Sequence, residues 1–122
     1  IIMKKILIVE DEQSLLKLLE ITFIGAGYEV IKAINSEETY KALAKGPDLI
    51  LLDILLPGES GLDILDNIKK DPKLKDIPVI MLTNFNEPER LAKAKKKGAV
   101  DYLVKSSNDP TTVLEKAEKY LQ

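Results

Sequence analysis

Residues 49–61 read LILLDILLPGESG, and this run is the clearest indication of the fold class. Four consecutive aliphatic residues precede Asp53 without polar alternation, which indicates a strand covered on both faces, as in a parallel sheet. The turn-forming residues Pro57, Gly58 and Gly61 follow and predict a tight connection into the next helix. The stretch therefore predicts a carboxylate at the end of a rigid, buried strand.

The same kind of apolar run recurs along the chain and alternates with segments of helical spacing. Strand-length runs lie at 5–9, 28–33, 48–52, 77–82 and 100–104. Helices are predicted over 14–26, 36–46, 62–70, 87–97 and 110–121. We expect Ser36 to be the N-cap of the second helix and Asp109 that of the fifth. This alternation predicts an α/β fold, a doubly wound parallel sheet with helices on both faces.

The length and charge of the chain limit what it can be. Its 122 residues, 45% of them hydrophobic, fit a single domain over residues 1–122, and we expect no separate effector domain. The 18 Lys and Arg residues nearly balance the 20 Asp and Glu residues, which argues against binding to nucleic acid or to an anionic membrane. We therefore expect partners among proteins and small molecules.

The absence of Cys and His excludes several chemistries. Without Cys there is no disulfide, thiolate metal site or thiol nucleophile. Without His, the usual general base at neutral pH is missing. No apolar run has the length of a membrane-spanning helix, and the first residues lack the pattern of a signal peptide. We expect a cytoplasmic protein whose chemistry uses carboxylates, hydroxyls and lysine.

Polar residues follow four of the predicted strands, at the point where each apolar run ends. They are Glu10, Asp11, Asp53, Thr83 and Lys105. Any one of them, taken alone, is most often a loop residue or a helix cap. The carboxyl ends of parallel strands meet at the same edge of a sheet, however, and there ligands bind in doubly wound folds. The joint pattern therefore predicts a single site.

The chemistry of these residues indicates a phosphoryl site with a metal. Three carboxylates that meet repel one another unless a cation lies among them. Oxygen ligands without His or Cys indicate Mg²⁺. A metal, the Thr83 hydroxyl and the Lys105 ammonium together suit the oxygens of a phosphoryl group. Asp53 is then the candidate nucleophile, whose carboxylate would become an acyl phosphate.

The chain resembles the receiver domain of bacterial two-component response regulators. The resemblance lies in four blocks in order: ILIVEDE (6–12), PDLILLDILLPGESGLDIL (47–65), IPVIMLT (77–83) and GAVDYLVK (98–105). It spans essentially the whole chain. It implies a flavodoxin-like fold, a doubly wound (βα)5 arrangement with a five-stranded parallel sheet in the order 2-1-3-4-5.

The resemblance also implies a role for each site residue. The Mg²⁺ ligands would be Glu10, Asp11, Asp53 and the backbone carbonyl of Leu55. Asp53 would be the phosphoacceptor, with Thr83 and Lys105 as its catalytic partners. Thr83 and Tyr102 would form the conformational switch, although Tyr102 alone also fits a half-buried strand aromatic.

The function that the resemblance implies is a signalling switch. The phosphoryl group would come from a histidine kinase or phosphotransfer protein, and a downstream protein would bind the altered face; neither nucleic acid nor membrane is an expected direct partner. The chain would catalyse only its own Mg²⁺-dependent phosphorylation and dephosphorylation, and is otherwise not expected to be an enzyme.

The sequence departs from the family pattern after the lysine. Family members usually carry proline there in a cis peptide, whereas this chain has Ser106. A cis bond before a non-proline residue costs about 2.5 to 4 kcal/mol, which favours a trans peptide and a different direction for Lys105.

Two apolar residues stand near the predicted site: Leu55 and Phe85 lie two positions after Asp53 and Thr83. We expect them to exclude the attacking water and slow dephosphorylation.

Other functions remain open at this level. A phosphate-independent adaptor with a degenerate receiver site is compatible with Ser106. An aspartyl-phosphate hydrolase of the haloacid dehalogenase type would need a second Asp where Leu55 stands. A flavin or nucleotide module would need a glycine- and hydroxyl-rich loop after the first strand, where the chain has EDEQS.

Overall fold

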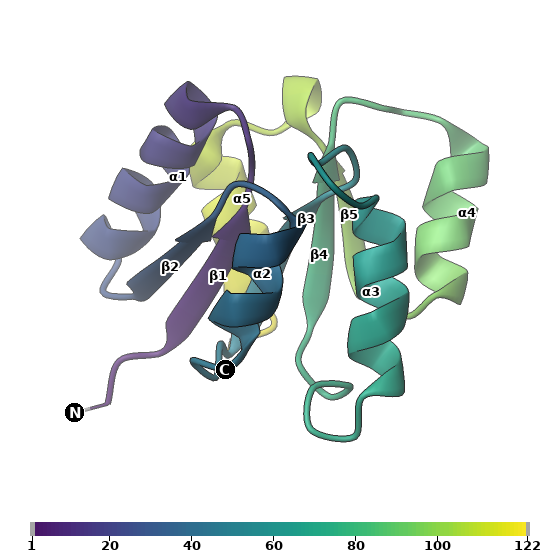
Figure 1. Cartoon of the computed structure of the whole chain (residues 1–122). Helices are drawn as coiled ribbons and strands as arrows, with labels where there is room; N and C mark the ends of the chain where they lie inside the picture. The colour runs from purple at the N-terminus through teal and green to yellow at the C-terminus, as the bar shows by residue number, and fades with distance from the viewer. Residues whose placement is uncertain (1, 122) are drawn as a thin grey trace.

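The computed structural model describes residues 2–121, so Ile1 and Gln122, the ends of the expected domain, lie outside the described residues. Strands and helices alternate as predicted (Figure 1). The strands are β1 (Lys5–Val9), β2 (Glu29–Ala33), β3 (Leu49–Asp53), β4 (Val79–Thr83) and β5 (Asp101–Val104). The α-helices are α1 (Gln13–Gly25), α2 (Ser36–Leu43), α3 (Gly61–Lys70), α4 (Pro88–Lys96) and α5 (Pro110–Glu118), and a short 3₁₀ turn at Lys105–Ser107 follows β5.

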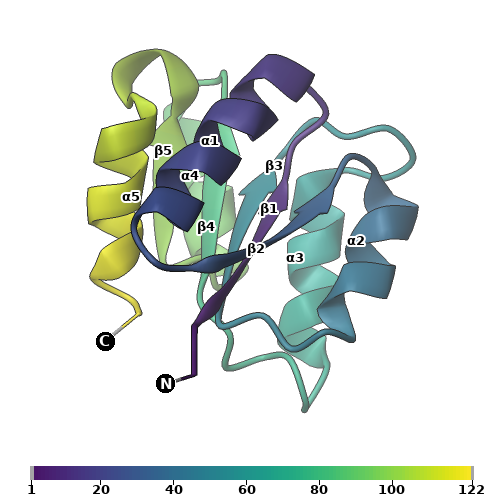
Figure 2. The ribbon, with the colours of Figure 1, turned by 90° about the vertical axis from the view of Figure 1, so that its left-hand side faces the viewer.

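The strands form one parallel sheet in the order β2-β1-β3-β4-β5. Helices α1 and α5 cover one face of the sheet, while α2, α3 and α4 cover the other (Figure 2). The doubly wound flavodoxin-like fold and its strand order are therefore confirmed.

Each central strand is apolar apart from one polar residue at an end, because each of its faces meets a helical layer. In β3, Ile50 and Leu52 pack against α2, α3 and α4, whereas Leu49 and Leu51 pack against α1 and α5. Strands β1 and β4 alternate in the same way. A strand buried on both faces has no position for a polar side chain until it leaves the sheet, so Asp53 can only stand at the strand's end.

Two predicted helix caps have different outcomes. Asp109 caps α5 as expected, because its side chain accepts a hydrogen bond of 2.8 Å from the Thr112 N–H. The prediction of Ser36 as the cap of α2 is wrong. The cap is Asn35, whose side-chain oxygen accepts the Glu38 N–H at 2.8 Å. Asn and Ser are both common N-cap residues. Asn35 is the cap because its side chain reaches the N–H of the third helical residue.

Among residues 2–121, no helix combines the length and the apolar composition needed to cross a membrane.

Candidate functional site

The strand register brings the predicted site residues to one edge of the sheet. Val9 pairs with Leu52, so Glu10 follows β1 beside Asp53. Thr83 ends β4 beside Val104 of β5, and Lys105 comes next. These residues surround a cavity of about 210 Å³, which is lined by Glu10, Asp11, Glu12, Asp53, Leu55, Thr83, Asn84, Phe85 and Lys105. The predicted convergence therefore occurs.

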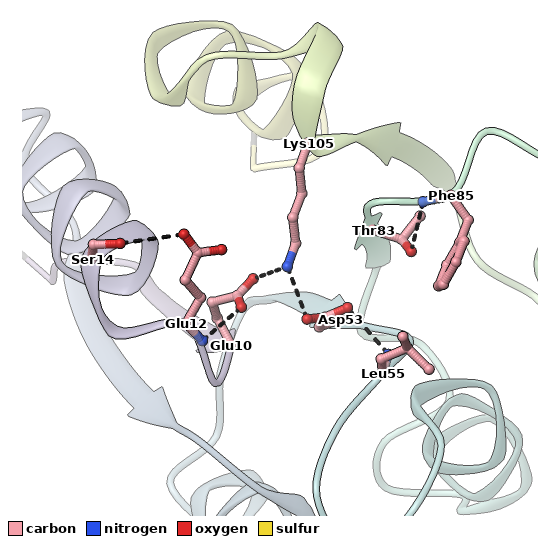
Figure 3. Close-up of polar contacts among 8 residues, drawn as sticks. All are labelled: Glu10, Glu12, Ser14, Asp53, Leu55, Thr83, Phe85 and Lys105. Atoms are coloured by element: carbon pink, nitrogen blue, oxygen red, sulfur yellow. Dashed lines mark hydrogen bonds and ion pairs between the residues drawn. The ribbon is translucent and has the colours of Figure 1, made fainter.

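Lys105 joins two carboxylates at the centre of the site (Figure 3). Its Nζ lies 2.9 Å from Asp53 Oδ2 and 2.6 Å from Glu10 Oε1. All three side chains are nearly buried, with exposed fractions of 9% for Lys105, 5% for Asp53 and 1% for Glu10. The peptide between Lys105 and Ser106 is trans, as expected. The trans peptide does not prevent Lys105 from reaching the acids, because its flexible four-carbon stem extends to them from the end of β5.

Burial and pairing act on these groups in opposite directions. Burial raises the pKa of Asp53 and that of Glu10, because it penalises the charged carboxylate, and hydrogen bonds from Lys105 offset part of the rise. Burial lowers the pKa of Lys105, but its hydrogen bonds to Glu10 and Asp53 outweigh this, and the net pKa is raised. Lys105 therefore stays charged and holds the two carboxylates together.

The acidic cluster fits a divalent cation. One carboxylate oxygen from each of Glu10, Asp11 and Asp53 lies within 4.8 Å of the others. Asp11 is exposed, while the other two are buried. The single Lys105 ammonium cannot neutralise three carboxylates, and an all-oxygen donor set suits Mg²⁺. The residues present therefore fit the expected ion.

Thr83 and Tyr102 are linked through the chain that follows β4. The fully buried Thr83 hydroxyl oxygen accepts the Phe85 N–H at 3.3 Å (Figure 3). The Tyr102 hydroxyl donates to the Phe85 carbonyl at 2.8 Å. Thr83 is not the cap of α4, which starts at Pro88. Phe85 thus connects the two predicted switch residues, a link that their positions in the sequence do not reveal.

The turn after β3 holds the Asp53 carboxylate from the other side. The Leu55 N–H donates to Asp53 Oδ1 at 3.2 Å, and the Leu55 side chain is 55% exposed beside the cavity. The predicted role of the Leu55 carbonyl as a metal ligand stays a prediction.

A further residue, Glu12, fixes Glu10 because the Glu12 N–H donates to Glu10 Oε2 at 2.9 Å. Sequence reasoning assigned no role to Glu12, since the contact uses its backbone.

Gly61 allows α3 to start directly against the backbone of Asp53. Its N–H donates to the Ile54 carbonyl at 2.7 Å, and a Cβ at this position would overlap with the Asp53 carbonyl. Only glycine therefore permits this approach of the helix to the strand end.

The Gly61→Ala substitution is expected to lower the free energy of unfolding by about 2 kcal/mol, because the backbone must shift to remove the overlap. Urea unfolding measures the change. The control is Gly25→Ala at the end of α1, where a Cβ meets nothing within 4 Å. That variant should be as stable as the wild type or slightly more stable, because alanine favours helix. Equal stability of the two variants would contradict the packing described at Asp53.

The comparisons with known proteins show the family of the chain. The chain matches the family model of the response regulator receiver domain over residues 6–118. It is 39% identical to the phosphate regulon transcriptional regulatory protein PhoB of Pseudomonas aeruginosa, over 84% of this chain and 45% of that protein. The chain thus spans about half the length of the curated relatives it matches.

Solved structures share the whole fold. A putative response regulator from Chloroflexus aurantiacus superposes with a TM-score of 0.90 at 31% identity, covering 98% of both chains. The chemotaxis response regulator CheY4 of Vibrio cholerae gives a TM-score of 0.90 at 30% identity, covering 98% of this chain and all of that one. The similarity therefore extends over nearly the whole chain.

Proposed function

This chain belongs to the response regulator receiver domain family, and on that premise we propose that Asp53 accepts a phosphoryl group from a partner histidine kinase or phosphotransfer protein. The observation that carries the proposal is the placement of Asp53 at the end of a buried strand, 2.9 Å from the Lys105 ammonium and beside two further acids.

In the proposed step, a carboxylate oxygen of Asp53 attacks the phosphorus of a phosphohistidine. The new O–P bond forms as the P–N bond breaks, and the bonding electron pair leaves with the imidazole nitrogen of the donor. Asp53 must be ionised to attack, and the Lys105 ammonium favours that form against the effect of burial. The same ammonium and the Thr83 hydroxyl are the chain's own groups for the phosphoryl oxygens.

Glu10, Asp11 and Asp53 would hold Mg²⁺, with the Leu55 carbonyl as the further predicted ligand. When bound, the ion supplies positive charge that offsets the clustered carboxylates and the phosphoryl oxygens. The chain's contribution is to bring one carboxylate oxygen of each acid within 4.8 Å of the others, with Glu10 and Asp11 directly after β1 and Asp53 at the end of β3.

The output of the proposed switch passes through Thr83 and Tyr102. A phosphoryl oxygen on Asp53 would accept a hydrogen bond from the Thr83 hydroxyl, whose oxygen accepts the Phe85 N–H. Movement of Thr83 would then affect Phe85, whose carbonyl is bonded to Tyr102. A downstream protein would bind the altered surface near α4 and β5. We propose no turnover of an external substrate, and no direct binding to nucleic acid.

Intact mass spectrometry tests the acceptor proposal. The protein is incubated with Mg²⁺ and either acetyl phosphate or a phosphohistidine protein, and one added phosphoryl group is expected. Asp53→Ala should gain none, while the control Asp66→Ala, on α3 and outside the cavity, should behave as the wild type. A wild type that gains no phosphoryl group from either donor would instead favour the phosphate-independent adaptor.

The phosphorylated protein is expected to hydrolyse slowly because apolar side chains flank the acyl phosphate. Leu55 and the ring of Phe85 line the cavity, and the Arg90 guanidinium lies 4.0 Å from the centre of that ring. Leu55→Asn should speed dephosphorylation by a factor on the order of 10, because an amide can orient the attacking water. Loss of the added mass with time gives the rate.

The matched control for this variant is Leu18→Asn. Leu18 on α1 is 53% exposed, close to the 55% of Leu55, but lies outside the cavity. Its dephosphorylation rate should equal that of the wild type. A Leu55→Asn rate equal to that of Leu18→Asn would show that the leucine does not limit access of water.

A further inference from the structure

The loop between β3 and α3, residues 54–60, is fixed at its start by the site itself. The Leu55 N–H donates to Asp53 Oδ1 at 3.2 Å. The position of the loop backbone therefore helps to set the direction of the Asp53 carboxylate. The far half of the same loop makes contacts outside the cavity, and the phosphoryl-transfer step proposed above does not use them.

A closed hydrogen-bond triangle holds the far end of this loop. Its members are Tyr40 on α2, Glu59 on the loop and Asn67 on α3. The Tyr40 hydroxyl lies 2.8 Å from Glu59 Oε2, and Asn67 Nδ2 donates to the Tyr40 hydroxyl at 2.8 Å. Asn67 Nδ2 also lies 3.3 Å from Glu59 Oε2. One loop residue is thus tied to two helices at once.

A second contact, a backbone hydrogen bond, holds the middle of the loop beside α2. The Ser36 N–H donates to the Pro57 carbonyl at 3.3 Å. Gly58 has a positive φ of 96°, and a Cβ there would lie 2.5 Å from Ser36 Oγ. The loop therefore follows the first turn of α2 closely, and Tyr40 on the same helix continues this attachment one turn later.

We propose that Tyr40, Glu59 and Asn67 are positioning residues that fix the loop and thereby set the Mg²⁺ affinity of the Asp53 site. The inference rests on the proposed function, because it concerns the same ion. Tyr40 is 38% exposed, so water could satisfy its hydroxyl without the triangle, and the bonds add little to stability. Their effect is instead to restrict the loop that carries Leu55 and leads from Asp53.

Hydrogen exchange of the metal-free protein tests the restriction directly. Tyr40→Phe removes one hydroxyl and keeps the ring, and we expect faster exchange of the amides in residues 54–60, including Leu55. The matched control is Tyr28→Phe. The Tyr28 hydroxyl makes a bond of the same length, 2.8 Å, to Glu118 of α5, far from this loop. Its loss should leave exchange in the loop unchanged.

Calorimetric titration with Mg²⁺ tests the consequence for the site. Tyr40→Phe and Asn67→Ala should each bind Mg²⁺ about 10-fold more weakly, the lower end of the loss found when residues that orient metal ligands are changed. The double variant should be little worse than either one, since both break the same unit. Glu59→Gln keeps an acceptor for Tyr40 and should stay close to the wild type, which separates positioning from charge.

The two proposals fail in different ways. A wild type that binds no Mg²⁺ overturns both. A wild type that binds Mg²⁺, together with a Tyr40→Phe variant that matches Tyr28→Phe in affinity or in loop exchange, overturns the positioning role alone. Thermal unfolding of all variants accompanies the titrations, and Asn67→Ala supplies the test should Tyr40→Phe not fold.

Discussion

The Asp53→Asn variant is expected to take up no phosphoryl group and to be more stable than the wild type without divalent ions. The first effect follows because an amide is not a nucleophile for phosphorus at neutral pH. The second follows because the pKa of Asp53 is raised by burial. A carboxylate with a raised pKa favours its neutral form in the folded protein, so its charge destabilises the fold at neutral pH.

The pH dependence gives the sign of the second effect. The folded wild type binds more protons than the unfolded chain between the ordinary pKa of 3.8 and the raised one, so its stability falls as pH rises through that window. The stability gain of Asp53→Asn should be complete above the raised pKa and should shrink as pH falls toward 3.8. Urea unfolding in a chelating buffer at several pH values measures it.

Asp66→Asn is the control of opposite sign. A hydrogen bond from Lys97 lowers the pKa of Asp66, so its charge stabilises the fold above the ordinary pKa. Removing that charge should make the protein slightly less stable at neutral pH, and phosphoryl uptake should persist. If both asparagine variants lose stability equally at neutral pH, the conclusion that the buried Asp53 charge destabilises the fold is wrong.

The Lys105→Ala variant is expected to lose about 3 kcal/mol of unfolding free energy at neutral pH without divalent ions. The substitution leaves two nearly buried carboxylates, those of Glu10 and Asp53, in contact with no cation. Mg²⁺ should restore part of the loss because it supplies the missing positive charge. Urea unfolding with and without Mg²⁺ measures both effects.

The loss in Lys105→Ala should also depend on pH. Lys105 lowers the pKa of both acids, so their pKa values rise further once it is removed. The variant should therefore regain stability as pH falls and the two carboxyl groups take up protons. Lys97→Ala is the control, because it removes a lysine from the more exposed pair with Asp66 at 3.2 Å, and only a small change is expected. A Lys105→Ala loss as small as that of Lys97→Ala would contradict a central role for the ammonium.

Much of the fold follows from the sequence because short strand-length runs alternate with segments of helical spacing along the whole chain. The remaining errors are local. The fourth strand was predicted from residue 77, but it begins at Val79, since Pro78 has no N–H for the sheet. The cap of α2 was placed one residue late because Asn35 and Ser36 are equally suitable neighbours.

Some features of the site could likewise be predicted from the sequence pattern, and others could not. The convergence of Asp53 and Lys105 was predictable, because parallel strands end at one edge. The direction of Lys105 was not, since it depends on how far a flexible side chain reaches rather than on the peptide beside it. The Tyr40–Glu59–Asn67 triangle joins residues up to 27 positions apart, on elements whose mutual packing no single-sequence pattern encodes.

Chemical mapping of the phosphoryl group tests the central claim most directly, namely that acids, a hydroxyl and an ammonium from four strand ends make Asp53 the acceptor. Borohydride reduces an acyl phosphate to an alcohol, so a phosphorylated aspartate becomes homoserine and can be located by peptide mass spectrometry. The account predicts homoserine at position 53, formed with Mg²⁺ and absent when a chelator replaces it. Modification at any other residue, or equal modification of Asp53 without divalent ions, would contradict it.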